Sequence, residues 1–192
     1  MLDLYNSGHR NVQPTVQSFV AVINAWSKSK DPFKAQKAQL QLEKMKELSK
    51  TIHNLQPNIF VYTSVLNSCA YTFGKIEYRQ QAMDIAVEIF GEMQNSPDIK
   101  LNHVAYGTFL KACRSLLRED TTRKNSLIEA TVRQCIRDGQ MGDIVLRQLV
   151  DIDPPEFKIK LLRRLSSNTV LCVDDIPNEW SSNVKDRRIW SQ

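Results

Sequence analysis

The side chains that most often carry chemistry are scattered in this sequence and form no catalytic or metal-binding pattern. No two cysteines are separated by two residues, and no histidine stands two residues before a glutamate. A zinc site needs such clustered ligands, so none is predicted, and the glycine loop of phosphate-binding proteins and the Gly-x-Ser-x-Gly turn of hydrolases do not occur either. We therefore expect no enzymatic activity, no metal and no cofactor. The residues considered are His9, His53, His103, Cys69, Cys113, Cys135 and Cys172.

Charged side chains gather at three places towards the C-terminal end, and each has an ordinary explanation. Two acidic pairs lack further ligands, so solvated loop carboxylates are expected rather than a cation site. A basic cluster falls on one side of an expected helix, where it can contact phosphates or simply face water. The net charge of +5 is compatible with a phosphate-bearing partner without requiring one. The groups are Asp151 with Asp153, Asp174 with Asp175, and Lys158, Lys160, Arg163 and Arg164.

The strongest pattern is an internal repeat. The segments PTVQSFVAVINAWSK, PNIFVYTSVLNSCAY and LNHVAYGTFLKACRS begin at Pro14, Pro57 and Leu101, which are 43 and 44 residues apart. In each segment an aromatic residue is followed four residues later by an aliphatic residue, and then by a small residue and by Trp or Cys. These spacings place the side chains on one face of a helix, which we expect to be buried. The positions are Phe19, Tyr62 and Tyr106, then Ile23, Leu66 and Leu110, then Ala25, Ser68 and Ala112, then Trp26, Cys69 and Cys113.

A second helix is expected after each of the first two segments. The sequences AQLQLEKM (38–45) and AVEIFGEM (86–93) both run from Ala to Met, and we expect both methionines to be packed between helices. Met45 and Met93 lie 48 residues apart, so the second unit holds five extra residues before its second helix. We expect these residues in the turn, within TFGKIEYRQQ, because helical repeats accept insertions in turns.

The remainder of the chain predicts weaker elements. The second helix of the third repeat is expected at 123–139, with Gly139 as its C-terminal stop. Two more helices are expected near 141–150 and 156–165. We therefore expect an all-α solenoid of stacked antiparallel helical hairpins with an irregular C-terminal tail, in which 169–173 suggests a short strand. The expected divisions are 1–15 (the end of a preceding, truncated repeat), 16–58, 59–102 and 103–139 (repeats), 140–166 (degenerate capping helices) and 167–192 (tail).

The repeat resembles the pentatricopeptide-repeat family. The resemblance lies in a first helix with Tyr/Phe-x-x-x-Ile/Leu-x-Ala/Ser-Cys/Trp and in a second helix that carries Glu and ends in Met, and it covers about residues 2–139. It implies a right-handed superhelix. The periods of 43 and 44 residues exceed the roughly 35 residues of the family, so longer helices or turns are expected. The Trp-x-x-Leu-Gly-x-x-Tyr signature of the peptide-binding tetratricopeptide repeats is absent.

The resemblance also implies a binding surface. In pentatricopeptide proteins the first helices line a groove that holds single-stranded RNA, about one base per repeat. One base-reading position directly follows the aromatic position of the pattern, another ends the repeat, and a third packs against the face of the base. In this chain they are Val20, Thr63 and Gly107, then Asn58 and Asn102, then Gln17, Phe60 and Val104.

These positions differ in what they can do. Thr63 with Asn102 matches the family's polar pair, which by resemblance favours adenine. Val20 and Gly107 have no side-chain group that can form a hydrogen bond to a base edge, so the first and third repeats would read bases poorly. For Asn58 and Asn102, capping of the following helix is an equally good interpretation.

The resemblance therefore implies a non-catalytic module that binds single-stranded RNA, acting in the RNA metabolism of a mitochondrion or plastid. The alternative is a protein–protein interaction scaffold without an RNA ligand, and a third hypothesis is the binding arm of an enzyme. No apolar run approaches the roughly 18 residues of a membrane span, so no membrane partner is expected. No transit peptide is visible in MLDLYNSGHRNVQ, and a monomer is expected.

Overall fold

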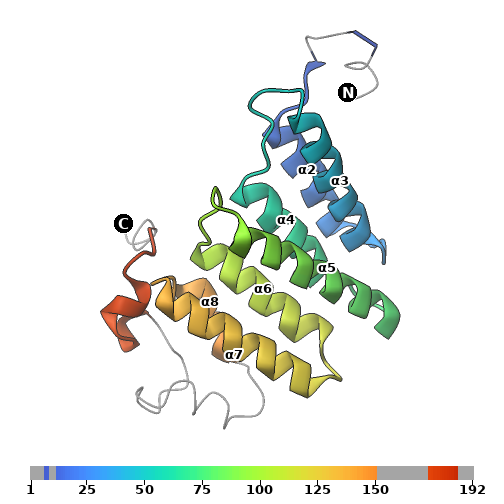
Figure 1. The fold of residues 1–192 in the computed structure, drawn as a ribbon. Coiled ribbons are helices and arrows are strands. Elements are labelled where there is room, and N and C mark those ends of the chain that lie inside the picture. The colour runs from blue at the N-terminus through green and yellow to red at the C-terminus, as the bar shows by residue number, and fades with distance from the viewer. Residues whose placement is uncertain (1–6, 9–11, 151–172, 186–192) are drawn as a thin grey trace, which may run out of the picture. The chain divides into compact units, whose positions relative to one another are not determined.

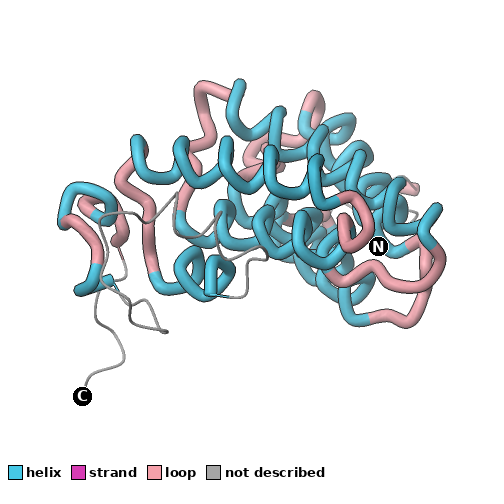
Figure 2. The backbone as a smooth tube through the Cα atoms, turned by 90° about the horizontal axis from the view of Figure 1, so that it is seen from below, coloured by secondary structure: helices cyan, strands magenta, loops and turns pink. Residues whose placement is uncertain are grey.

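The computed structural model describes residues 7–8, 12–150 and 173–185, and these residues form seven α-helices and short 3-10 helices without a strand (Figures 1 and 2). The all-α prediction is confirmed. The expected helix at 156–165 and residues 169–172 of the expected strand lie outside the described residues, as does most of the expected repeat remnant at 1–15. By its internal contacts the chain divides into two compact units, Met1–Lys100 and Leu101–Gln192.

The first unit consists of two helical hairpins. The first hairpin pairs α2 (Val16–Lys28) with α3 (Lys34–Ser49), and the second pairs α4 (Ile59–Ala70) with α5 (Ile76–Asn95). Helix α2 packs beside α4, and α3 packs beside α5, so the first helices form one layer and the second helices form the other (Figure 1, blue to green). This arrangement leaves one side of α2 and α4 facing away from the second layer.

Polar side chains start the first helices at equivalent repeat positions. Thr15 forms a capping box with Ser18, whose backbone N–H lies 3.2 Å from the Thr15 hydroxyl. The side-chain oxygen of Asn58 caps α4, and that of Asn102 caps α6 (His103–Leu116). Each oxygen satisfies backbone N–H groups that have no partner inside the helix, so each repeat carries its own start signal.

Most of the repeated apolar residues form the core, as predicted from their spacing, but Ala25 is exposed and Trp26 is half-buried. The aromatic, aliphatic and methionine positions are all buried, and Cys69 and Cys113 are fully buried beside them. Ser68 shows why a small residue recurs next to Cys69: its hydroxyl reaches the Ile23 carbonyl of α2 at 3.3 Å, so the two helices approach closely. The buried repeat residues are Phe19, Ile23, Met45, Tyr62, Leu66, Met93, Tyr106 and Leu110.

The five extra residues of the second repeat do not lengthen the turn, which corrects the prediction from the sequence. The turns 29–33 and 71–75 are equally long, and α5 instead begins at Ile76 and runs for 20 residues, against 16 for α3. The physical reason lies in IEYRQQ, which contains good helix formers and neither Gly nor Pro. Arg79, Ala82 and Met83 are buried, so packing also favours the longer helix.

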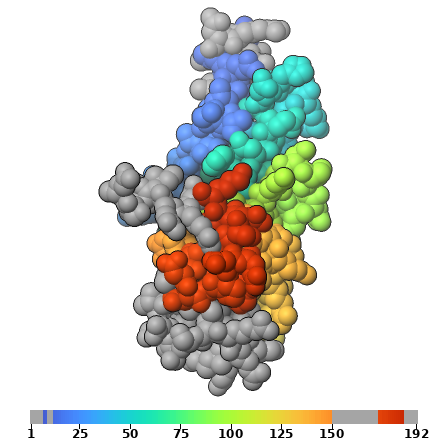
Figure 3. Space-filling view, turned by 90° about the vertical axis from the view of Figure 1, so that its left-hand side faces the viewer, coloured from blue at the N-terminus to red at the C-terminus, as the bar shows by residue number. Residues whose placement is uncertain are grey.

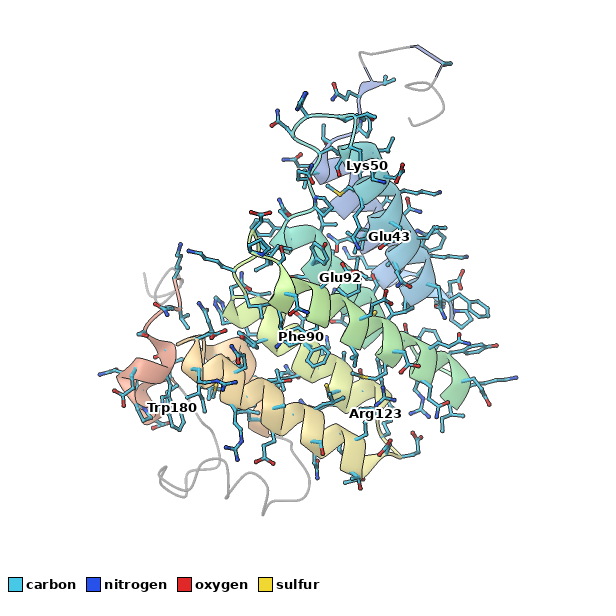
Figure 4. All side chains as sticks on the ribbon, viewed as in Figure 1. Glu43, Lys50, Phe90, Glu92, Arg123 and Trp180 are labelled. Carbon is cyan, nitrogen blue, oxygen red and sulfur yellow. The ribbon has the colours of Figure 1, made fainter. Side chains whose placement is uncertain are left out.

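A row of polar contacts joins the two second helices. Gln36 donates to Gln81 at 2.8 Å, and Gln39 donates to Glu88 at 3.0 Å. Farther along, the Lys46 ammonium donates to the carboxylates of Glu43 at 2.8 Å and Glu92 at 2.7 Å. Figure 4 labels Glu43 and Glu92 on these two helices. The outer layer is therefore held by polar pairs and the interior by apolar packing.

The second unit contains α6, α7 (Thr121–Arg137), α8 (Asp143–Val150) and two 3-10 helices, η2 (Val173–Asp175) and η3 (Asn178–Ser181). Helix α6 packs against both α7 and α8. Gly139 ends α7 as predicted, with a φ of +64° that favours glycine. The segment 173–185 lies against this end of α7, where Met141 N–H donates to the Trp180 carbonyl at 2.8 Å (Figure 3, red).

No helix in the described ranges combines the length and the apolar character that crossing a lipid bilayer requires.

Candidate nucleic-acid interface

One side of α4 carries the side chains that are best suited to hold a ligand. Phe60, Thr63, Asn67 and Tyr71 follow one another at intervals of three, four and four residues, which places them on one helix face; we call them the α4 stripe. Phe60 is 69% exposed and Tyr71 is 49% exposed, although both are aromatic. Thr63 and Asn67 are half-buried between them. The residues that share this helix but face inwards are buried, so the stripe is the open side of α4.

Two polar groups of the α4 stripe, on Thr63 and Asn67, are not engaged by the described residues. Threonine hydroxyls in helices often donate to the carbonyl four residues earlier, as Thr108 and Thr131 do here, and as Thr72 does just after the end of α4. The Thr63 hydroxyl and the Asn67 side-chain amide, in contrast, form no hydrogen bond with any other described residue. They therefore offer a hydroxyl and an amide, spaced one helical turn apart, to an external ligand.

The matching side of α2 is less suited to reading a base. Its equivalent residues are Gln17, Val20, Asn24 and Lys28, of which Gln17 and Lys28 are exposed and the other two half-buried. Val20 stands where α4 has Thr63 and offers only methyl groups. Since α2 lies beside α4 in the same layer, this face supplies a neighbouring surface with two amides, Gln17 and Asn24, and one cation, Lys28.

Asn58 and Asn102 act as helix caps. The Asn58 side-chain oxygen accepts from the N–H groups of Phe60 at 3.1 Å and Val61 at 3.3 Å, and the Asn102 oxygen accepts from Ala105 N–H at 2.9 Å. The side-chain nitrogen of each residue makes no hydrogen bond to another described residue. Each asparagine therefore has a structural role through its oxygen and an unused donor on its nitrogen.

Replacing these caps separates the two roles. Asn58→Ala and Asn102→Ala are each expected to lower the free energy of unfolding by about 0.5–2 kcal/mol, because a capping oxygen is lost. Asn58→Asp and Asn102→Asp keep that oxygen and remove only the donor, so they should stay close to the parent. Urea unfolding monitored by circular dichroism measures the difference. Equal losses in the alanine and aspartate variants would contradict the capping role.

The third repeat presents a different surface at the same positions. Gly107, the counterpart of Val20 and Thr63, is buried under α8. A Cβ atom added to it would lie 2.5 Å from Ile144 Cγ2 and 3.3 Å from the Ile144 backbone. Gly107 is therefore a close-packing position between α6 and α8. Val104 is half-buried on the same helix, and Lys111 stands where the other first helices carry Asn24 and Asn67.

A buried tyrosine, Tyr106, is paired with the half-buried carboxylate of Asp138 in the second unit, and this pair is structural in character. The Tyr106 hydroxyl donates to the Asp138 carboxylate at 2.5 Å, and Gln134 donates to the other oxygen of the same carboxylate at 3.0 Å. Burial, together with the hydrogen bond to Asp138, raises the pKa of Tyr106 well above its usual range. A tyrosine that holds its proton so firmly cannot serve as a base or nucleophile near neutral pH, so the pair ties α6 to the end of α7.

The remaining reactive side chains do not come together. Within the described ranges, no group of three or more His, Cys, Asp or Glu residues is placed to hold a metal ion. His53 is exposed in a loop and His103 is buried at the start of α6, whereas His9 and Cys172 lie outside the described residues. The basic residues Lys158, Lys160, Arg163 and Arg164 and the acidic pair Asp151 and Asp153 also lie outside them.

Two members of the α4 stripe were not singled out from the sequence. Asn67 and Tyr71 continue the spacing that starts with Phe60 and Thr63, so helical periodicity alone could have found them. What periodicity does not give is their exposure, which depends on where the neighbouring helices pack.

Comparison with known proteins adds no assignment to this geometry. No family model matches the chain, and neither a curated protein nor a solved structure matches it. The functional argument therefore rests on the residues and their placement.

Proposed function

We propose that this chain binds single-stranded RNA and that the α4 stripe is its principal contact. The observation that carries the proposal is Phe60, an aromatic side chain left 69% exposed beside two unengaged polar groups. An exposed ring stacks on the face of an unpaired base, and such stacking contributes about 1–3 kcal/mol per base. Thr63 and Asn67 can then form hydrogen bonds to the edge of that base. Paired bases hide both their faces and their edges, so a single strand is the expected ligand.

The resemblance to pentatricopeptide repeats supports the same assignment from the sequence. By that resemblance Thr63 acts together with Asn102, and the pair prefers adenine. We also propose that the hairpins of this chain stack as a right-handed α-solenoid, in which each first helix contributes a contact to one nucleotide. The same resemblance makes the transcripts of a mitochondrion or plastid the proposed targets.

The experiment compares Phe60→Ala with Leu40→Ala, using fluorescence anisotropy of labelled single-stranded RNA. Leu40 is also a large apolar residue with high exposure, 52%, but it lies on α3 in the other layer. We expect Phe60→Ala to weaken binding roughly tenfold, because one stacking contact is lost, and Leu40→Ala to leave binding within about twofold. Oligonucleotides that differ at one base test the edge contacts: the parent should prefer adenine, and Thr63→Asn should shift the preference towards a pyrimidine.

The results also decide between specific and nonspecific binding. Affinity should fall as salt is added, because lysine–phosphate contacts are screened. Equal affinity for duplex DNA and single-stranded RNA would show simple charge attraction. An unchanged base preference in Thr63→Asn, with altered stability, would make Thr63 a surface residue without a reading role.

A protein-interaction scaffold is the second candidate, and the covered position of Gly107 favours it. Of the three residues that follow the aromatic position, only Thr63 offers an open polar side chain, because Val20 is apolar and Gly107 lies beneath Ile144. A chain that reads long sequences would need more such positions. If the parent binds no single-stranded RNA even at low salt, the scaffold replaces RNA binding as the function.

A further inference from the structure

We infer that the single strand also contacts the turn edge of the first unit, which we define as Lys28, Lys30, Tyr71, Phe73 and Lys75. These residues belong to the α2–α3 and α4–α5 turns and to the helix ends next to them. The inference rests on the proposed function, since the same ligand is held. It adds one stacking platform, Phe73, next to Tyr71 of the α4 stripe, and a set of phosphate contacts at one end of α4.

The two turns form one continuous surface. The Lys34 ammonium, at the start of α3, lies 5.0 Å from the ring centroid of Phe73 in the other turn and donates to the Ser27 carbonyl at 3.2 Å. The rings of Phe33 and Tyr78, one from each hairpin, meet edge to face with centroids 5.0 Å apart. In Figure 1 both turns lie on the right-hand side of the first unit. Contacts across the hairpins therefore hold the aromatic residues of this edge in place.

Exposed aromatic rings are concentrated at this edge. Tyr71 and Phe73 are each 49% exposed, and Phe33 and Ile76 beside them are also exposed. Burying an aromatic side chain is favourable, so leaving several in water on one small surface needs a reason. Stacking of unpaired bases supplies one, because every base has a flat face and requires no preformed pocket.

The charge at the turn edge indicates an anionic partner. Lys28, Lys30 and Lys75 are exposed, and none of them forms an ion pair with a described residue. Asp31, the acid nearest in sequence to Lys28 and Lys30, is already paired with Lys37, and the exposed Glu77 lies two residues from Lys75. Three exposed lysines outnumber the one unpaired acid, so exposed rings among excess cations match a strand whose bases stack and whose phosphates bind lysine. The Asp and Glu side chains of an acidic peptide would satisfy the cations but carry no aromatic face to cover the rings.

The turn edge is also continuous with the α4 stripe, because Tyr71 belongs to both. Phe60 and Tyr71 are 11 residues apart, which corresponds to roughly 16 Å along a helix. A stacked strand covers that length with about five nucleotides. A strand that stacks on Phe60 can therefore continue along α4 to Tyr71 and Phe73.

The test uses two matched pairs of variants in the full chain. Tyr71→Ala/Phe73→Ala removes the edge rings, and Leu40→Ala/Val87→Ala removes two exposed apolar residues elsewhere in the first unit. Lys30→Gln/Lys75→Gln removes two edge charges, and Lys44→Gln/Lys100→Gln changes the net charge equally at other exposed sites. The probes are single-stranded oligoadenylates of about 4 and about 12 nucleotides, with polyglutamate as the acidic-peptide probe. Circular dichroism and thermal unfolding establish that each variant is folded.

We expect the longer oligonucleotide to bind the parent more tightly than the shorter one, and the edge-ring variant to lose roughly tenfold of that affinity. The edge-lysine variant should reduce the slope of log affinity against log salt by about 1.4, and both control variants should match the parent. RNA binding that is lost in Phe60→Ala but kept in both edge variants overturns this inference and leaves the proposed function standing. If the parent binds no RNA, both the proposed function and this inference are overturned. If the edge variants lose binding to polyglutamate but keep binding to RNA, the turn edge belongs to a protein partner and this inference is overturned.

Discussion

Raising the pH from about 9 to about 10.5 is expected to lower the free energy of unfolding by about 3 kcal/mol, through Cys69 and Cys113 alone. Both thiols are fully buried, one in each unit. Burial raises the pKa of each to about 12, from an ordinary value of 9.0. Burial also raises the pKa of Cys135, which acts in the same direction.

The sign follows from counting protons in the two states. Between the ordinary and the raised pKa, the unfolded chain loses the thiol proton while the folded chain keeps it. The folded state then binds more protons, so its stability is fully present below about pH 9 and decreases as the pH rises towards 12. Each thiol contributes a slope of at most about 1.4 kcal/mol per pH unit. Lys34 acts in the opposite direction, because burial lowers its pKa.

Urea unfolding under reducing conditions, at several pH values from 8 to about 10.5, measures this loss. Cys69→Ala and Cys113→Ala provide the matched test. At pH 8 each variant should be less stable than the parent, because a buried side chain is shortened, and this difference should shrink as the pH rises, because the variant lacks one of the titrating thiols. A parent whose stability is constant across this range, or variants with unchanged slopes, would show that these thiols ionise freely in the folded chain.

The second large effect is a contrast between two glycines in helix interiors. Gly107→Ala is expected to lower the free energy of unfolding by about 1–3 kcal/mol, because the new methyl group would lie 2.5 Å from Ile144 Cγ2. Ile144 is β-branched and stiff in a helix, and its backbone is also within 3.3 Å, so neither can easily move aside. Gly91→Ala, in α5, meets no atom within 4 Å and should stabilise the protein by about 0.5–1 kcal/mol.

A double-mutant cycle identifies the contact responsible. Ile144→Ala removes the Cγ2 atom, so adding Gly107→Ala to that background should cost clearly less than adding it to the parent. The same urea titration serves all four proteins. If Gly107→Ala stabilises the chain as Gly91→Ala does, α8 does not pack on α6 as closely as the structure shows. A smaller cost of Gly107→Ala in the Ile144→Ala background would establish that α8 covers Gly107, whose counterpart in the second repeat is Thr63.

The secondary structure and the core were largely predictable because they depend on local signals. The spacing of Phe19 and Ile23, repeated in Tyr62 with Leu66, defines a buried helix face from periodicity alone. Capping side chains mark where helices begin, and Gly139 marks where α7 ends, since both satisfy or terminate backbone hydrogen bonds within a few residues. The start of α5 was predicted incorrectly because helix propensity in IEYRQQ was given less weight than the tolerance of turns for insertions.

The candidate site divides in the same way. The sequence alone determined that Phe60 and Thr63 share one face of a first helix, because the helical period places them there, and that Gly107 is the counterpart of Thr63, because the repeat aligns the two. Only the tertiary structure decided that Phe60 is exposed, that the polar groups of Thr63 and Asn67 are unengaged, and that Gly107 is covered. The physical reason is that exposure depends on contacts between distant residues, such as Gly107 with Ile144 or Phe73 with Lys34. No local pattern records which side of a helix its neighbours will cover.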